Sequence, residues 1–458
     1  MKAALLSCLF SAVLAAQPTS LTISWVGQSC FILRGDNGPT VVADPPAPSI
    51  GYTLPAVTGD VVVITHNHPD HNNSAGIGGK STLVDGRPTT TRQELTAAGL
   101  PFILIPGFHD NQNGAQRGPN TMIRWTQFGL KIAHLGDLGQ EQLTPAQLAD
   151  LQNLDILFIP AGGFFTFSPE RAAGYVNELK PKVAILMHYR TALAGSAQAA
   201  ALPEAAQPFS PLRYKPATVV VNADTLPKST EVWVMEPLAD AVAVNAATYQ
   251  PGMPVSPSAI SSLFGKFTAA GTASASQFPL PRKLADTEVL LSGKAVPLYY
   301  ASNSQVNFQV PAFQAPGQAL AEVRVGGQSV ARAPITILPN SPGVFAIANQ
   351  DFSRNSASRP AHPGEILHIY ATGLGAVSPT VEEGVAAPAQ PLATSISNPN
   401  VFLGGRQLAV AYSGLAPGLA GVWQLDVPLP TDAVTGPDLL LTVSLGAGEH
   451  SVPVTVTR

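Results

Sequence analysis

The stretch that decides the fold is Thr65-His66-Asn67-His68-Pro69-Asp70-His71, which ends the apolar run 61–65. A short continuous apolar run predicts a buried strand. His66 and His68 are two residues apart at its end, so both rings can project to the same side. Asp70 and His71 follow in a turn and can approach from another side. This mixture of imidazole and carboxylate suits zinc or a related transition metal. Because the chain holds only nine histidines in 458 residues, the cluster indicates a metal site.

The sequence around this stretch, residues 21–237, mixes strand and helix signals and predicts an α/β domain. Apolar runs predict strands at 21–25, 30–33, 40–43, 61–65, 131–135, 183–187 and 230–235. Helices are predicted at 89–98, at 145–151 with Thr144 as N-cap, and at 169–179 with Ser168 as N-cap. Segment 191–216 is rich in Ala, Pro and Ser, and we interpret it as an irregular insertion.

From about residue 240 onward, helix signals almost vanish and short alternating strands dominate. Gly293-Lys294-Ala295-Val296-Pro297-Leu298-Tyr299-Tyr300 resembles Gly405-Arg406-Gln407-Leu408-Ala409-Val410-Ala411-Tyr412, and both copies place Gly and Tyr seven apart. This internal repeat predicts two tandem all-β, Ig-like sandwiches, at 240–338 and 339–458.

Composition narrows the class of protein. Charged residues make up 12% and hydrophobic residues 45% of the chain, with 40 Gly and 43 Pro. These values exclude a disordered, collagen-like or coiled-coil protein. The net charge of −4, without a Lys/Arg cluster, argues against nucleic acid as a partner.

The N-terminus has the pattern of a targeting segment. Lys2 precedes the apolar run 3–16, which predicts a signal peptide over residues 1–16 and a secreted or periplasmic mature protein. Cys8 would leave with it, so Cys30, in an apolar strand, is expected to be a buried thiol without a disulfide partner. No later apolar stretch has the length of a transmembrane segment.

Further motifs stand in order around the histidine stretch: Ser24-Trp25-Val26-Gly27-Gln28-Ser29-Cys30-Phe31, Ala43-Asp44-Pro45, Gly107-Phe108-His109-Asp110, His134-Leu135-Gly136-Asp137 and Met187-His188-Tyr189. With His66-x-His68-x-Asp70-His71, they resemble the metallo-β-lactamase superfamily of binuclear metallohydrolases over residues 21 to about 190. Pro160-Ala161-Gly162-Gly163 with Thr166 resembles a loop of one subgroup. That subgroup includes the ascorbate-phosphate lactonase and, more distantly, the phospholipase D that acts on N-acyl-ethanolamine lipids.

The resemblance implies an αββα metallo-β-lactamase sandwich with two divalent transition-metal ions at one edge. Zinc is the expected metal, and manganese or iron would also suit the ligands. By motif, the first ion is held by His66, His68 and His109, and the second by Asp70, His71 and His188, with Asp137 bridging both. A hydroxide between the ions would be the nucleophile. Asp70 would orient it and shuttle its proton.

Several residues near these motifs keep open roles. His134 competes with His109 as a ligand, but along strand 131–135 it has opposite parity to Asp137, which favours a supporting or core role. Asp44 is expected to hold the metal loop through backbone hydrogen bonds. Tyr189 and Arg190 follow a ligand and either contact substrate or face solvent.

The C-terminal half resembles a region recurrent in exported proteins of acidobacteria, which carries no established chemistry. We expect a structural role, or a cell-surface or carbohydrate contact. The whole chain is interpreted as a secreted hydrolase of an ester-like bond (lactone, amide or phosphodiester) in a small-molecule or lipid-like substrate. The alternative is a non-catalytic binding or cell-surface protein built on the same scaffold. Loops 111–118 and 161–166 are expected to form the pocket.

Overall fold

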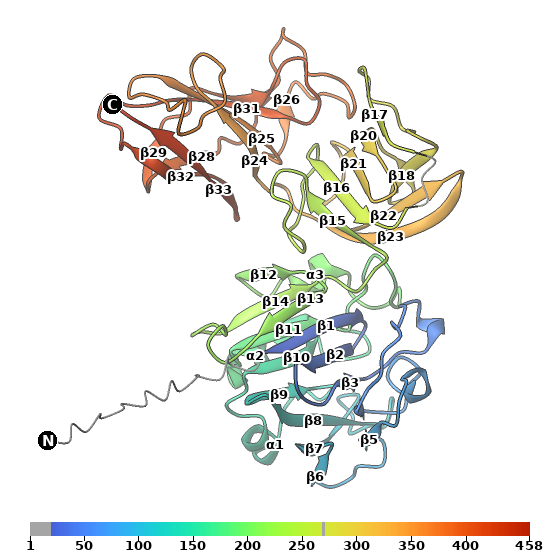
Figure 1. Cartoon of the computed structure of the whole chain (residues 1–458). Helices are drawn as coiled ribbons and strands as arrows, with labels where there is room; N and C mark the ends of the chain where they lie inside the picture. The colour runs from blue at the N-terminus through green and yellow to red at the C-terminus, as the bar shows by residue number, and fades with distance from the viewer. Residues whose placement is uncertain (1–19, 268–270) are drawn as a thin grey trace, which may run out of the picture.

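A computed structural model describes residues 20–267 and 271–458 of the chain. The predicted signal peptide, residues 1–16, lies outside the described residues. The described chain is mostly β-structure and forms six sheets in three groups (Figure 1). We call these groups the N-terminal domain, the first sandwich and the second sandwich; their strands fall within residues 21–235, 241–337 and 343–456.

The first sheet of the N-terminal domain has the strand order β13-β1-β2-β3-β4-β5. Its strands are β13 (Thr218–Val221), β1 (Leu21–Gly27), β2 (Cys30–Gly35), β3 (Val41–Ala43), β4 (Val61–Ile64) and β5 (Thr82–Asp85). β1, β2 and β3 pair antiparallel, whereas β3, β4 and β5 run parallel. β3 and β4 are buried along their whole length, which explains their unbroken apolar sequences.

The second sheet has the order β12-β14-β11-β10-β9-β8-β7-β6. Its strands are β12 (Leu212–Lys215), β14 (Glu231–Met235), β11 (Val183–Met187), β10 (Ile156–Pro160), β9 (Leu130–His134), β8 (Pro119–Gln127), β7 (Leu100–Phe108) and β6 (Gln93–Ala97). Helix α1 (Pro145–Asp150) contacts β7, α2 (Pro169–Leu179) contacts β10, and α3 (Leu202–Ala206) contacts α2.

The main core of this domain lies between the two sheets. Phe31 of β2 stacks on Phe158 of β10 with ring centroids 4.0 Å apart. Trp25 and Trp125 are likewise buried there. Removing these large apolar side chains from water is the dominant favourable contribution to folding.

The outer face of the first sheet departs from the expected αββα architecture. A smaller apolar cluster, which includes Cys30, Val42, Val62 and Tyr52, covers that face. The covering chain between β3 and β5 forms only two 3-10 turns, η1 (Pro48–Ile50) and η2 (Ser74–Gly76). Prolines at 45, 46, 48, 55 and 69 explain the missing helix, because each removes a backbone N–H donor and restricts its neighbour. Cys30 is buried and free, as predicted.

The structure confirms two of the three predicted helices. Thr144 forms a capping box with Gln147 at the start of α1, and Ser168 caps α2. The helix predicted at 89–98 is wrong, because Gln93–Ala97 is the strand β6, paired with β7. Ala98 and Gly99 both have positive φ, 46° and 80°, which suits a tight two-residue hairpin turn. The segment 191–216, expected to be irregular, contains α3 and β12.

Each C-terminal sandwich contains one larger sheet and one four-stranded sheet. The first sandwich comprises β15 (Ala241–Asn245), β16 (Ile260–Gly265), β21 (Gln305–Gln309), β20 (Leu298–Ala301) and β17 (Ala273–Ser274), facing β19 (Lys294–Ala295), β18 (Thr287–Leu291), β22 (Gly317–Val325) and β23 (Gln328–Ile337). The second comprises β24 (Gly343–Ala348), β25 (Ile366–Thr372), β31 (Trp423–Pro428), β30 (Tyr412–Leu415), β27 (Thr394–Ser395) and β26 (Val377–Ser378), facing β29 (Arg406–Leu408), β28 (Asn400–Leu403), β32 (Gly436–Leu445) and β33 (Gly448–Val456).

The internal repeat corresponds to equivalent hairpins in the two sandwiches. Gly293 lies in the turn between β18 and β19, and Gly405 lies in the turn between β28 and β29. The four-stranded sheets have matching orders, β19-β18-β22-β23 and β29-β28-β32-β33. The two sandwiches therefore share a strand plan, while their immunoglobulin-like classification stays a prediction.

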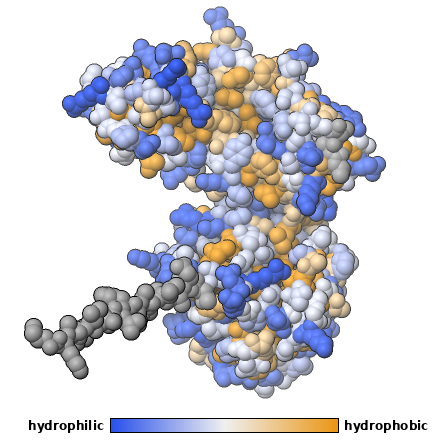
Figure 2. All heavy atoms as spheres, in the orientation of Figure 1, coloured by the Kyte–Doolittle hydropathy of each residue, from blue (hydrophilic) through white to orange (hydrophobic). Residues whose placement is uncertain are grey.

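The three parts contact one another through specific hydrogen bonds. Thr372 of the second sandwich accepts a hydrogen bond from the Ile260 amide of the first at 3.0 Å. Gln318 of the first sandwich accepts one from the Ala192 amide of the N-terminal domain at 3.1 Å. On the face shown in Figure 2, apolar residues gather where the two sandwiches meet. No helix in the described part of the chain is long and apolar enough to cross a membrane.

Leu238, which follows the predicted domain end at 237, contacts the first sheet of the N-terminal domain. Its amide donates to the Trp25 carbonyl at 2.9 Å. Its side chain packs against the apolar cluster that covers the first sheet.

Candidate metal centre

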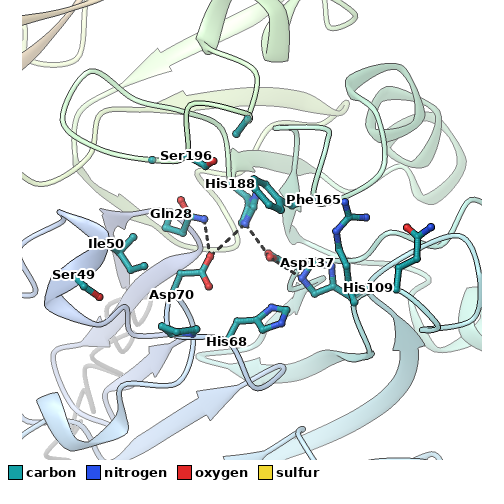
Figure 3. Close-up of a pocket in the computed structure, with 15 residues that line it drawn as sticks. Gln28, Ser49, Ile50, His68, Asp70, His109, Asp137, Phe165, His188 and Ser196 are labelled. Carbon is teal, nitrogen blue, oxygen red and sulfur yellow. Dashed lines mark hydrogen bonds and ion pairs between the residues drawn. The ribbon is translucent and has the colours of Figure 1, made fainter.

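The predicted ligands follow strands whose carboxyl ends meet at one edge of the two sheets. His66, His68, Asp70 and His71 follow β4. His109 follows β7, Asp137 comes three residues after β9, and His188 directly follows β11. β7, β9 and β11 point the same way, because β8 is antiparallel to both β7 and β9, and β10 is parallel to both β9 and β11. Figure 3 shows Asp70, His109, Asp137 and His188 converging on one cavity.

The seven residues form two adjacent groups of potential ligand atoms. His66, His68 and His109 form one group, and Asp70, His71, Asp137 and His188 form the other; within each group the ligand atoms lie within 4.8 Å of one another. Asp137 lies between the groups. One of its oxygens is 3.2 Å from His71 Nε2, and the other is 3.2 Å from His109 Nε2 and 2.9 Å from His188 Nε2.

Unpartnered polar atoms mark the centre as a site for cations. The Nε2 atoms of His66, His71 and His188 and Oδ1 of Asp137 are buried without a hydrogen-bond partner of good geometry among the described residues. Leaving such atoms unsatisfied costs free energy unless something else binds them. Imidazole nitrogens and carboxylate oxygens are the donors that zinc and related transition metals accept, so the residues present fit the implied ions.

The electrostatics of the centre favour added positive charge. Burial alone would raise the pKa of Asp137, but His188 and His71 outweigh it and hold that pKa well below its usual range. Burial opposes charge on His188, yet the Asp137 and Asp70 carboxylates raise its pKa to about 9. Burial and the neighbouring His71 lower the pKa of His66 and keep its ring neutral. Because a metal ion binds imidazole only in its neutral form, an ion bound here would displace the extra proton of His188 and supply the positive charge itself.

Asp44 orients two of the histidines from behind. Its carboxylate accepts the Thr65 amide at 2.8 Å, the Thr65 hydroxyl at 2.6 Å and His71 Nδ1 at 2.7 Å. Because the Thr65 hydroxyl donates to Asp44, its oxygen is free to accept from His66 Nδ1 at 3.0 Å. These contacts occupy Nδ1 of both rings and leave Nε2 aimed at the centre. The structure thus places Asp44 where the sequence analysis expected it, holding the metal loop.

His134 lies outside both groups. Its Nδ1 accepts the Gly136 amide at 3.0 Å, so its Nε2 carries the proton and donates to the Ser29 carbonyl at 2.8 Å. Both ring nitrogens are therefore used, and none is left for a metal. Burial lowers the pKa of His134 and favours this neutral form.

The backbone around His188 and Asp137 is tightly positioned. His188 has φ of 56°, a left-handed conformation that residues other than glycine rarely adopt. Gly162 permits the close approach of the neighbouring loop, since a Cβ there would lie 2.0 Å from the His188 carbonyl oxygen. Asn120 accepts the Asp137 amide at 2.9 Å and donates to the Leu135 carbonyl at 2.9 Å, which fixes the turn that carries Asp137. Backbone strain of this kind is concentrated at functional sites.

A cavity of about 640 Å³ opens onto the centre. Its walls come from the β1–β2 turn, from four loops and from the centre itself. It is lined by Gln28, Ser49, Ile50, His68, Pro69, Asp70, His109, Gln116, Arg117, Asp137, Phe165, His188, Gly195, Ser196 and Ala199. Gln28 donates to Asp70 at 2.9 Å, which fixes the most accessible carboxylate of the group.

Comparison with known proteins identifies the N-terminal domain. Residues 22–188 match the family described as the Beta-lactamase superfamily domain. A UPF0173 metal-dependent hydrolase of Methanoculleus marisnigri is 30% identical over 190 residues, which cover 37% of this chain and 82% of the relative. The chain belongs to the metallo-β-lactamase superfamily. A second UPF0173 metal-dependent hydrolase, from Lawsonia intracellularis, is 31% identical and covers 37% of this chain and 84% of the relative.

A solved structure of a metallo-β-lactamase superfamily protein from Thermotoga maritima is also similar to this chain. It is 29% identical, covers 48% of this chain and 100% of the other, and has a TM-score of 0.39. The family match and the UPF0173 relatives, rather than this structure, show that the chain is a metal-dependent hydrolase, and its metallo-β-lactamase domain is followed by further β-sheets.

Tyr189 and Arg190, which could contact substrate according to the sequence, do not line the cavity. Tyr189 is fully buried in the metallo-β-lactamase domain, with its ring centroid 5.3 Å from that of Trp25, and does not line the cavity. The idea that it touches substrate is wrong, because its ring packs against Trp25 in the core. Arg190 is exposed and is not among the lining residues.

Four residues that line the cavity or fix the metal centre were not predicted from the sequence: Gln28, Arg117, Asn120 and Phe165. Gln28 lies within the quoted motif 24–31, but no role was predicted for it. Arg117 and Phe165 lie in the two loops expected to form the pocket. Asn120 and Thr121 are buried polar residues in the apolar strand β8, and that interruption was the available signal.

Proposed function

We propose that the chain is an exported hydrolase that binds two divalent transition-metal ions and cleaves an ester-like bond in a lactone, an amide or a phosphodiester. The observation that carries this proposal is the pair of adjacent ligand groups with Asp137 between them. Zinc is the metal we expect, and manganese or iron would suit the same donors. When bound, the ions would supply Lewis acidity and lower the pKa of water.

Residues around the ions would transfer the proton, position the carboxylate of Asp70 and exclude water. Asp70 is the natural proton carrier, because its side chain is 21% exposed at the cavity whereas that of Asp137 is 2% exposed. Gln28 holds the Asp70 carboxylate by one oxygen and leaves the other free. Phe165 and Ile50 supply apolar cavity wall that excludes water from a bound substrate.

The cavity supports a small-molecule or lipid-like substrate. Its volume of about 640 Å³ lies within the usual range for small-molecule sites. The lactonase-like or phospholipase D-like subgroup is part of this proposal, as is a cell-surface or carbohydrate contact through the two sandwiches. Export through the 1–16 segment is tested by N-terminal sequencing of protein recovered outside the cytoplasm.

Metal counting and a substrate screen together test the proposed function. Purified protein, loaded with zinc and desalted, is expected to retain close to two ions by elemental analysis. It is then assayed on matched panels of lactones, amides and phosphodiesters, with Asp70→Asn as the inactive control. Protein that retains no metal after reconstitution, or activity that survives Asp70→Asn, would contradict the proposal.

A further inference from the structure

Arg117 is a cation in the cavity without a counterion. It is the single Lys or Arg among the residues that line the cavity. No carboxylate in the described part of the chain lies within ion-pair distance of its guanidinium. Most other arginines near the domain surface do have partners; Arg87, for example, pairs with Asp85 and Arg92 with Asp150.

The carboxylate nearest in sequence is committed elsewhere. Asp110 is buried and accepts backbone N–H groups from Gln112, Gly114, Gln116 and Arg117 at 2.8, 2.9, 2.9 and 2.7 Å. These four donors hold the pKa of Asp110 below its usual range despite burial. The loop that carries Arg117 is therefore pinned at its backbone, while the guanidinium stays unpaired.

Two aromatic rings hold the guanidinium at the cavity. Its central carbon lies 5.6 Å from the Phe164 ring centroid and 5.9 Å from that of Phe165. An aromatic face stabilises a cation but takes none of its N–H donors, so those donors stay available. Phe165 in turn lies 6.3 Å from the His188 ring, centroid to centroid. Figure 3 shows Phe165 beside His188, so the aromatic pair connects Arg117 to the metal centre.

The rest of the cavity wall offers no competing charge. Away from the ligand groups it consists of neutral residues: Gln28, Ser49, Ile50, Pro69, Gln116, Gly195, Ser196 and Ala199. Its two carboxylates, Asp70 and Asp137, both belong to the metal centre. A fixed, unpaired guanidinium in such a cavity matches a carboxylate or phosphate in charge and geometry.

We propose that the substrate carries an anionic group, a carboxylate or a phosphate, separate from the bond that is cleaved, and that Arg117 binds it. This proposal rests on the proposed function, since it assumes that the scissile bond lies at the metal centre. It narrows the proposed substrates from lactones, amides and phosphodiesters in general to those that carry a second, distal anionic group.

Equilibrium binding of bifunctional probes tests this assignment. Each probe is a hydroxamate, which binds the metal ions, joined by alkyl chains of increasing length to a carboxylate, a phosphonate or a neutral carboxamide. Affinities are measured by titration calorimetry on the zinc-loaded full chain. One chain length is expected at which an anionic probe binds at least ~10-fold more tightly than its carboxamide, the size of a charge-assisted hydrogen bond. The better of the two anions identifies the group.

Variants assign the effect to Arg117. Arg117→Gln is expected to abolish the preference for the anion while the carboxamide probe binds as before. Arg117→Lys should keep part of the preference. Arg34→Gln removes an exposed arginine of β2 that does not line the cavity, and should keep all of it. Zinc content and melting temperature of each variant report whether it has folded.

The outcomes separate this inference from the proposed function. Equal binding of charged and neutral hydroxamates at every chain length, or a preference that survives Arg117→Gln, overturns the role of Arg117 and leaves the metal centre intact. A chain that holds no zinc and binds none of the hydroxamates overturns the proposed function as well.

Discussion

His109 and His134 are both buried, but Nε2 of His109 lies in the centre, 3.2 Å from Asp137, whereas both ring nitrogens of His134 are hydrogen-bonded outside it. We therefore expect His109→Ala to lose one ion or most of its affinity, since a direct ligand is removed. His134→Ala should keep two ions at saturating zinc and lose about 10–100-fold in rate or affinity, as residues that orient ligands typically do. Both variants are loaded with excess zinc, desalted and counted. One ion in His134→Ala with two in His109→Ala would reverse the assignment.

Substitution of Asp44 tests whether its carboxylate orients the metal ligands. Asp44→Asn replaces a carboxylate that accepts three hydrogen bonds with an amide that has one accepting oxygen, so Thr65 and His71 lose part of their support. Zinc affinity should fall about 10–100-fold, measured by competition with a chelator. Asp60→Asn is the matched control, because Asp60 also accepts a backbone amide, that of Thr40, but does so away from the centre. Equal affinities in the two variants would show that Asp44 does not orient the ligands.

For single residues, the sequence predicts the candidate metal ligands better than it predicts the residues that hold these ligands in position. His66, His68 and Asp70 share one short stretch, so their proximity is a local property. Asn120 and Gln28 reach the centre from strands distant in sequence, and only the paired sheets bring them there. Tyr189 shows the same limit, because its burial depends on Trp25 from the opposite end of the domain.

Among the elements, strand β14 is followed directly by a buried acid with a raised pKa. Glu236 is 8% exposed, and burial raises the pKa of its carboxyl to about 8 from the ordinary value of 4.5. The folded state therefore binds a proton that the unfolded state releases, and the stability contributed by this proton is lost as pH rises from about 4.5 to 8.

Replacing this acid should remove that pH dependence. Glu236→Gln is expected to melt close to the wild type near pH 4 and well above it near pH 8, a difference of up to a few kcal/mol. Melting temperatures across this range provide the measurement, and Glu94→Gln, at an exposed position of β6, is the control. A constant difference between Glu236→Gln and wild type at every pH would contradict the expected titration.

Helices and strands could be predicted where the deciding signal lies in neighbouring residues, such as a helix cap. They could not be predicted where the structure depends on pairing with a distant strand. The caps at Thr144 and Ser168 are local and gave α1 and α2 correctly. Residues 89–98 have no strong local preference, and their strand exists because β7 offers an edge with which to pair. The αββα expectation failed for a local reason, since the prolines between β3 and β5 exclude helix there.

In the whole molecule, the first sandwich supports the wall of the cavity. Segment 195–199 lines the cavity, and the amide of nearby Ala192 donates to Gln318 of the first sandwich. Gln318→Ala should loosen this wall and weaken hydroxamate binding a few-fold, while zinc content stays at two ions. Gln328→Ala, at the exposed far end of the same hairpin, is the control. Unchanged binding in Gln318→Ala would show that the sandwich does not influence the cavity.

The repeat predicts two C-terminal sandwiches, and the described strands form three groups, but the sequence does not predict the contacts between these groups. Gly293 and Gly405 are turn residues whose spacing to the next tyrosine is visible in the sequence. The bond from Ile260 to Thr372 joins a backbone amide to one hydroxyl, and nothing in either sequence segment indicates its partner.

The buried thiol of Cys30 gives the molecule a natural probe of partial unfolding. It is completely enclosed beneath the loops that cover the first sheet, and burial raises its pKa, so a thiol reagent reacts only after that sheet opens. The sequence contains no cysteine after position 30. In protein prepared without residues 1–16, Cys30 is the single cysteine, so its labelling rate under native conditions reports the opening of the metal-binding domain, whereas a melting curve combines all three parts. Comparing that rate with and without zinc would measure how much of the kinetic stability of the domain comes from its ions.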